Sequence, residues 1–130
     1  MNDGFIDGNN ENDHIDNTLD GGYIFAGYSL SDDGDVSGHH GTLSEEDVWV
    51  MKVDSLGGFE WQISLGGTAA DIGQGIRSTS DGGYIVIAET YSDDGDVTGY
   101  HPPVNPPAIG GDFWLVKLDA AGNILWEHAF

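Results

Sequence analysis

Residues 12–130 contain one unit written twice, and this internal repeat restricts the possible folds more than any other feature of the chain. Three motifs of the first copy recur in order in the second: DGGYI (20–24 and 81–85), SDDGDVSG (31–38, with SDDGDVTG at 92–99) and DVWVMKVD (47–54, with DFWLVKLD at 112–119). Four extra residues in the second copy change the offset from 61 to 65 before the third motif. Repetition of this kind is typical of arrays built from one small structural unit. We expect an N-terminal extension at 1–11, a first repeat at 12–67 and a second repeat at 68–130.

Each repeat contains four stretches with the composition of β-strands, separated by glycine-containing turns. In chain order these stretches are NDHIDNTL (12–19), YIFAGY (23–28), VWVMKV (48–53) and FEWQISL (59–65), then GQGIRSTS (73–80), YIVIAE (84–89), FWLVKL (113–118) and ILWEHAF (124–130). No stretch shows a helical period with capping residues. We therefore predict an all-β chain of two four-stranded antiparallel sheets, each resembling one blade of a β-propeller.

The same motifs resemble tandem repeats of bacterial and archaeal surface proteins, which have the form DGGYIVAG, SxDGDVSG, DxWVVKLDxxGNxxW and LGG. The pieces that match are DGGYIFAG, SDDGDVSG, DVWVMKVD, LGGFEW and SLGGTAAD, followed by the second set. The resemblance spans about nine-tenths of the chain. It implies a propeller-like, secreted or cell-surface repeat module, and it implies no enzymatic activity. NNENDHIDNTL at 9–19 is more polar than the pattern, which indicates a frayed first strand or a capping variant.

Two blades do not close a ring, because propellers contain about four to eight blades. The chain is therefore expected either to be part of a longer propeller or to complete a ring by self-association. Three copies would supply six blades and four copies would supply eight, by closed cyclic symmetry.

The charge of the chain excludes some partners. The sequence has 23 acidic residues against 3 basic ones, for a net charge of −20. Nucleic acids and anionic membrane surfaces need clustered Lys and Arg, so neither is expected as a partner. No apolar run approaches the ~20 residues of a membrane span, so no membrane insertion is predicted either. The acidity favours cations, basic partners or a salty medium. The absence of cysteine excludes disulfides and thiolate chemistry.

The two acidic octets, 31–38 and 92–99, predict calcium sites. Both have the form D-x-D-x-[ST]-G, and calcium prefers loops that present six to eight oxygen ligands in this way. An EF-hand would need glutamate at the twelfth position, where this chain has Ser44 and Asn105, so an EF-hand is excluded. The aspartates that begin the third strands are expected to close the sites instead. The predicted ligands are Asp33, Asp35, Ser37, the backbone carbonyl of His39 and Asp47, then Asp94, Asp96, Thr98, the backbone carbonyl of Tyr100 and Asp112.

Alternatives for these polar residues stay open at this stage. Asp, Gly and Ser also form solvated turns, and a halophilic adaptation would explain the acidity without a metal. His39 and His40 are adjacent and could bind a transition metal, although their spacing matches no zinc pattern. The four tryptophans fall at two equivalent positions of the repeat, which favours blade core over carbohydrate stacking.

The sequence contains no pairing of a nucleophile and a base that defines an enzyme family. We therefore expect a non-enzymatic repeat module, stabilised by calcium, with a scaffolding role or a role in binding a glycan or protein ligand. The alternatives are a carbohydrate-binding, lectin-like module and a fragment of a secreted hydrolase.

Overall fold

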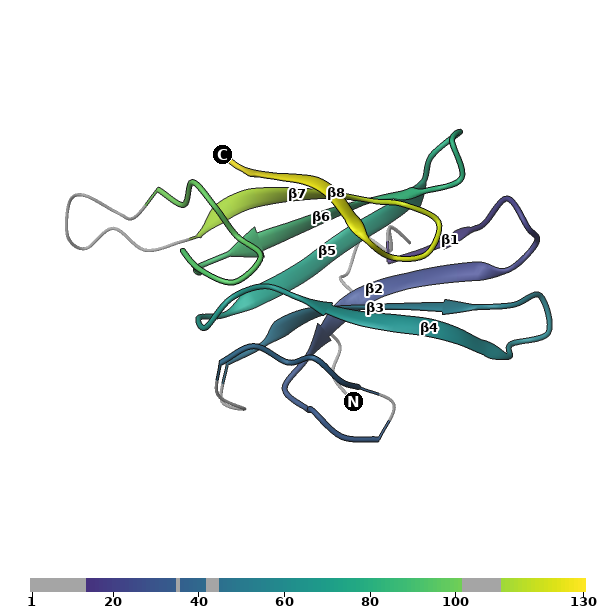
Figure 1. Ribbon diagram of the computed structural model, residues 1–130, viewed down its shortest axis with the longest axis horizontal. Helices are drawn as coiled ribbons and strands as arrows, with labels where there is room; N and C mark the ends of the chain where they lie inside the picture. The colour runs from purple at the N-terminus through teal and green to yellow at the C-terminus, as the bar shows by residue number, and fades with distance from the viewer. Residues whose placement is uncertain (1–13, 35, 42–44, 102–110) are drawn as a thin grey trace, which may run out of the picture.

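The computed structural model describes residues 14–34, 36–41, 45–101 and 111–130. This part of the chain forms two open, four-stranded antiparallel sheets and no helix (Figure 1). The first sheet contains β1 (Ile15–Asn17), β2 (Tyr23–Ser29), β3 (Asp47–Val53) and β4 (Phe59–Leu65), and the second contains β5 (Asp71–Ser78), β6 (Tyr84–Thr90), β7 (Asp112–Leu118) and β8 (Ile124–Ala129). Neighbouring strands follow chain order in both sheets. The predicted all-β fold with two four-stranded antiparallel sheets is confirmed.

The DGG motif forms the same tight turn before the second strand of each sheet. Gly21 and Gly82 have φ values of 90° and 88°, a region that favours glycine. In the first turn, Thr18 N donates to Gly22 O at 3.0 Å, and Gly22 N donates to Thr18 Oγ1 at 3.0 Å. A strand therefore starts at the residue after DGG in both copies, as the repeated sequence predicts.

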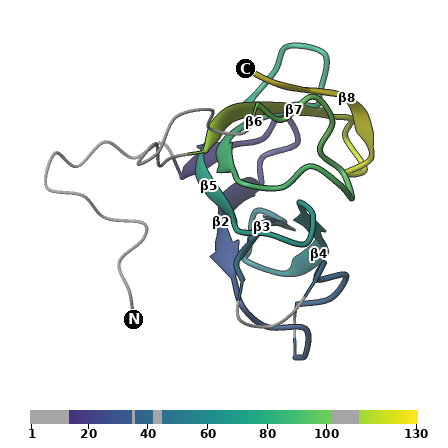
Figure 2. The ribbon, with the colours of Figure 1, turned by 90° about the vertical axis from the view of Figure 1, so that its left-hand side faces the viewer.

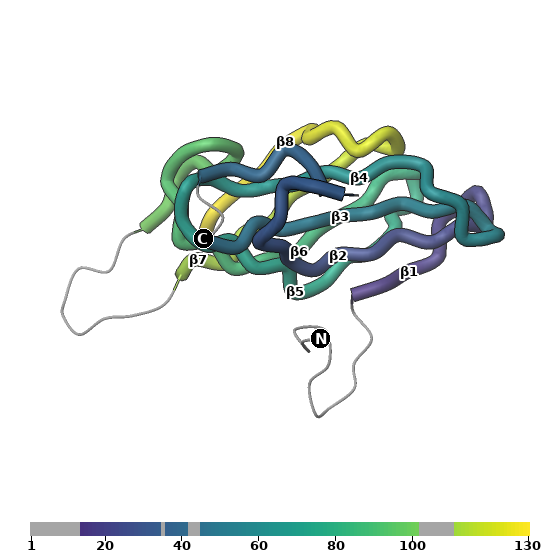
Figure 3. Tube along the Cα trace, turned by 90° about the horizontal axis from the view of Figure 1, so that it is seen from below, coloured from purple at the N-terminus to yellow at the C-terminus, as the bar shows by residue number. Residues whose placement is uncertain are grey.

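The two sheets stack face to face, with β5 packed against β1, β2 and β3 (Figures 1 and 2). Figure 3, seen from below, shows β1 to β4 side by side in chain order. The approach is close enough that a Cβ on Gly73 of β5 would lie 2.4 Å from Gly27 O of β2. A hydrogen bond of 2.7 Å from Asp71 N to Glu46 O also joins the two sheets.

One core fills the space between the sheets. The first sheet contributes the inner face of β2, β3 and β4, and the second contributes the inner face of β5, β6, β7 and β8. The fully buried hydrophobic residues include Ile24, Ala26, Val48, Val50, Leu65, Val86, Ala88, Trp114, Val116 and Leu118. At the rim of this core the ring of Trp61 lies 6.0 Å from the ring of Tyr84. The repeats therefore share a core.

Lys52 is a buried lysine at one end of this core. Its Nζ lies 2.8 Å from Glu60 Oε1 and 3.2 Å from Asp20 Oδ2. Burial disfavours the charge, but the hydrogen bonds that Lys52 donates to these two carboxylates outweigh that effect and raise the pKa of Lys52. Lys52 thus stays charged and links the DGG turn to β4.

In the described part of the chain there is no helix long and apolar enough to cross a membrane.

Candidate functional site

The acidic octets lie in the loops that join the second and third strands of each sheet. We call residues 31–41 the first acidic loop and residues 92–101 the second acidic loop. Both contain the same turn: Val36 N donates to Asp33 O at 3.0 Å, and Val97 N donates to Asp94 O at 3.1 Å. Since the octets are almost identical, the chain folds the same way locally in both copies.

The second acidic loop binds the segment that connects the two sheets. Both oxygens of the Asp94 carboxylate accept hydrogen bonds of 2.8 Å from Thr68, one from its backbone N–H and one from its hydroxyl. Asp96 Oδ2 accepts a bond of 3.1 Å from Gly66 N, and Asp96 N donates to Gly66 O at 2.8 Å. We call this set of bonds the interrepeat clasp. It joins the acidic loop of the second repeat to the residues that follow β4, the last strand of the first sheet.

Backbone contact in the clasp is tight. A Cβ on Gly95 would lie 2.4 Å from Gly66 O, so only glycine fits between the two aspartates without a shift of the backbone. The backbone N–H of Thr68, and then its hydroxyl, lower the pKa of Asp94 below its usual range. The clasp therefore favours the ionised form of this aspartate.

Asp71, the first residue of β5, lies beneath the clasp and is fully buried. Its carboxylate accepts hydrogen bonds from Gly67 N at 2.9 Å, from the Ser92 hydroxyl at 2.9 Å, and from the Thr90 hydroxyl. Burial raises the pKa of Asp71, although these three bonds oppose the increase. Our sequence analysis did not select Asp71 as a functional residue. The motif SLGGTAAD contained it, but a buried role is visible only once the sheets are stacked.

The aspartates that begin β3 and β7 bind histidines. Asp47 Oδ2 accepts a bond of 2.7 Å from His40 N and lies 2.7 Å from His40 Nδ1. Asp112 Oδ2 accepts a bond of 2.7 Å from His101 N and lies 2.8 Å from His101 Nδ1. The sequence analysis missed this pairing, although His40 and His101 are separated by the repeat offset of 61 residues.

His40 also reaches the other repeat, since its Nε2 lies 3.4 Å from Asp96 Oδ2. Nδ1 of the neighbouring His39 lies 3.9 Å from Asp47 Oδ2. The second oxygen of Asp47 is buried and has no hydrogen-bond partner in the described part of the chain. Burial is the main cause that raises the pKa of Asp47. The imidazole of His40 thus connects acidic groups of both repeats.

The hydroxyl residues of the octets attach each loop to the last strand of its own sheet. Gln62 Nε2 donates to Ser37 Oγ at 2.6 Å, and Ser37 N donates to Gln62 Oε1 at 3.2 Å. At the equivalent positions the Thr98 hydroxyl donates to Glu127 Oε2 at 2.5 Å, and Trp114 Nε1 donates to Glu127 Oε1 at 2.7 Å. These predicted ligands therefore have defined partners within the protein.

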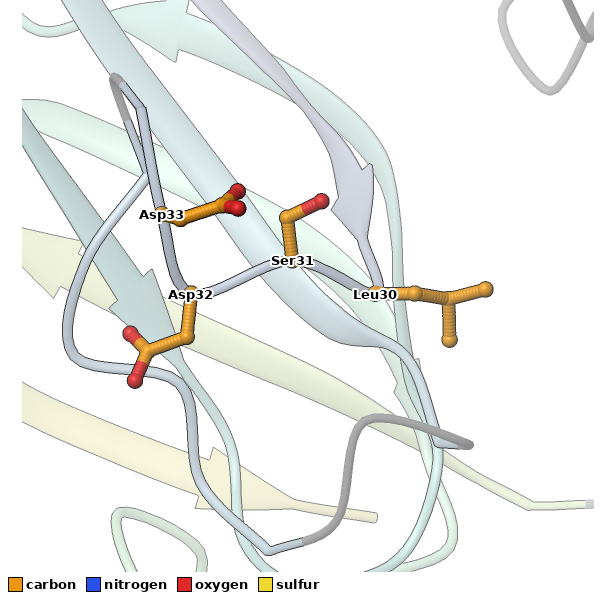
Figure 4. Close-up of a pocket in the computed structure, with 4 residues that line it drawn as sticks. All are labelled: Leu30, Ser31, Asp32 and Asp33. Atoms are coloured by element: carbon orange, nitrogen blue, oxygen red, sulfur yellow. The ribbon is translucent and has the colours of Figure 1, made fainter.

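The predicted calcium ligands do not gather at one point in the described residues. In the first acidic loop, Asp32 and Asp33 point to opposite sides of the backbone, next to a hollow of about 360 Å³ that they line with Leu30 and Ser31 (Figure 4). Asp35 lies outside the described residues, and Tyr100 is partly buried beside His101. Across the described ranges, no group of three or more His, Asp and Glu side chains is arranged to hold a metal ion. Calcium binding thus stays a prediction from the sequence.

This chain matches no known protein-family model and no curated protein.

Proposed function

We propose that this chain is a non-enzymatic, extracellular module of propeller-type repeats, with a role in scaffolding or in binding a ligand. The observation that carries the proposal is the interrepeat clasp. The acidic residues of the second loop form hydrogen bonds with the backbone that links the sheets. This use of polar residues favours a role in joining repeats over a role in chemistry on a substrate.

The two sheets are proposed to be consecutive blades of a propeller-type array. They have the same strand order, share one core and are connected through the clasp. A secreted or surface location follows from the resemblance of the repeats and agrees with the acidity of the chain.

Calcium is proposed as a further stabilising factor. A carboxylate has about four acceptor positions, so Asp94 and Asp96 can accept the bonds of the clasp and still offer oxygens to a cation. Asp47, with one buried oxygen that has no hydrogen-bond partner among the described residues, is a further donor of the kind that calcium prefers. The spacing of the octets is the main support for this part of the proposal.

The experiment that tests the joining role compares two double variants with the same loss of charge. Asp94→Ala with Asp96→Ala removes the carboxylates of the clasp. Asp33→Ala with Asp93→Ala removes two exposed carboxylates that accept no hydrogen bond from the described residues. Both variants are compared in EDTA, because Asp33 is a predicted calcium ligand. We expect urea unfolding of the clasp variant to shift to a lower midpoint in a single transition, because the sheets share one core, while the control unfolds like the parent. Equal behaviour of the two variants would contradict the joining role.

Carbohydrate binding is a second candidate, because Trp126 and Phe113 are exposed on one face of the second sheet. Exposed aromatic rings can stack on sugars. Glycan-array binding that Trp126→Ala abolishes would support this candidate. Turnover of a polysaccharide or peptide substrate would instead favour the hydrolase interpretation.

A further inference from the structure

The outer face of the second sheet repeats the buried inner face of the first sheet. Val48 and Leu65 are fully buried between the sheets, whereas their repeat equivalents Phe113 and Phe130 are 72% and 58% exposed. We call this outer surface the second-sheet face, and its residues are Ile87, Phe113, Leu115, Lys117, Trp126 and Phe130. Strand register places them together, because Ile87 pairs with Leu115 and Lys117 pairs with Trp126. Most of these side chains are large and apolar, and Lys117, Glu89 and His128 are polar groups on the same face.

The outer face of the first sheet shows the reverse relation. Tyr84 is 3% exposed and Trp114 is fully buried between the sheets. Their repeat equivalents are Tyr23, which is 38% exposed, and Trp49, which is only partly buried. We call this surface the first-sheet face, and its residues are Tyr23, Phe25, Trp49, Met51 and Phe59. Phe25 pairs with Met51, and Val53 pairs with both Tyr23 and Phe59, so these residues also form one patch.

These two outer faces are complementary, because the chain already contains the equivalent contact between its two inner faces. Inside the chain, the inner face of the first sheet packs on the inner face of the second. The residues of the second-sheet face are the repeat equivalents of those on the inner face of the first sheet. The residues of the first-sheet face are the repeat equivalents of those on the inner face of the second sheet. Trp61 packs against Tyr84 within the chain. Trp126 on one copy is thus placed to pack against Tyr23 on another.

We propose that a second copy of this chain docks head to tail, with its first-sheet face on the second-sheet face of the first copy. This inference rests on the proposed function, since it treats the two sheets as consecutive blades. A second copy is the partner that the structure favours. Its first-sheet face carries the repeat equivalents of the residues with which the second sheet covers the inner face of the first sheet. The contact is heterologous, so it can continue into a closed ring.

The test uses one variant on each face and measures mass in solution by light scattering. Phe113→Glu places a charge on the second-sheet face, and Phe59→Glu places one on the first-sheet face. Leu56→Glu is the matched control, because Leu56 is 95% exposed in the turn between β3 and β4. Far-UV circular dichroism and thermal unfolding establish that each variant is folded.

We expect the parent chain and Leu56→Glu to assemble, and each face variant to be monomeric. An equimolar mixture of Phe113→Glu and Phe59→Glu should form a 1:1 dimer, because each variant keeps the face that the other lacks. Only a head-to-tail contact gives this rescue. A monomeric parent chain, with or without a bound glycan, would overturn the proposal. So would dimers of Phe59→Glu alone, which would indicate a contact between two second-sheet faces.

Failure of docking is distinguishable from failure of the proposed function. The clasp lies within one chain, so the unfolding of the Asp94→Ala, Asp96→Ala variant reports on the joining of repeats even when the chain is monomeric.

Discussion

Replacing Asp71 with alanine removes a fully buried acidic group at the junction of the two repeats. The side chain accepts hydrogen bonds from Gly67 N and from the hydroxyls of Thr90 and Ser92. The Ser92 hydroxyl keeps a second acceptor, Ala69 O, at 3.2 Å. The substitution therefore leaves two buried donors without an acceptor, those of Gly67 and Thr90.

A buried donor without a partner costs about 1–3 kcal/mol. Two such donors correspond to a loss of about 2–6 kcal/mol. Removing a buried carboxylate also relieves the cost of desolvating it, and this cost is the reason that burial raises the pKa of Asp71. We therefore expect Asp71→Ala to reduce the free energy of unfolding by about 2–4 kcal/mol, a large part of the ~5–15 kcal/mol typical of a domain.

The assay is equilibrium unfolding in urea, in which a change of midpoint at constant slope reports stability. Asp71→Asn keeps one acceptor oxygen and should lose less. Asp93→Ala, at an exposed position of the neighbouring loop, should change the free energy by less than about 0.5 kcal/mol. A loss below about 0.5 kcal/mol for Asp71→Ala would refute the reasoning, since it would mean that the carboxylate does not satisfy these donors.

Three further predictions concern the loops. Gly34 and Gly95 occupy the same octet position with φ values of 63° and 64°, but only Gly95 lies against the backbone of Gly66 and Gly67. Gly34→Ala should therefore lower the free energy of unfolding in urea by about 1–2 kcal/mol, and Gly95→Ala should lower it clearly more. Hydrogen bonds from a threonine hydroxyl and a turn amide lower the pKa of Asp81 to about 2, so the stability it contributes is present above pH 4 and is lost as the pH falls toward 2. The urea midpoint of Asp81→Asn should accordingly depend less on pH between 4 and 2 than that of the parent, and an unchanged dependence would contradict this. Calcium titrated after EDTA at fixed ionic strength should raise the melting temperature more than magnesium does, and Asp94→Asn with Asp96→Asn, which alters the second of the two predicted sites, should reduce the difference; an equal rise with either ion would contradict calcium binding.

Much of the fold could be predicted from the sequence because the relevant information is local. The DGG turn fixes the start of β2 and β6, and the apolar stretches at 48–53 and 113–118 correspond to β3 and β7. Alignment of the two copies was sufficient to give four strands in each sheet. The strand after each acidic loop began at Asp47 and Asp112, the residues that the alignment had already matched.

The partners of Asp94 and Asp96 could not be predicted in the same way, because they lie in the segment between the two sheets, far from the octet in sequence. Asp94 and Asp33 are equivalent in sequence, yet only Asp94 has the linker residue Thr68 beside it. The tryptophans show the same limit. Trp114 is fully buried while Trp126 is 49% exposed, although both were expected in the blade core. Stacking covers one face of each sheet, and the sequence of a repeat does not say which neighbours are present.

The octet of the second repeat holds the segment that leads from the first sheet to the second, and nuclear magnetic resonance tests this at two atoms. The carboxyl carbon of Asp94 and the backbone amide proton of Thr68 are followed as the pH is lowered. We predict that Asp94 titrates below its usual pKa of about 3.8, that the amide signal of Thr68 follows the same curve, and that Asp94→Asn removes this dependence. An Asp94 carboxyl that titrates at its ordinary value, with no response at Thr68, would contradict the interrepeat clasp.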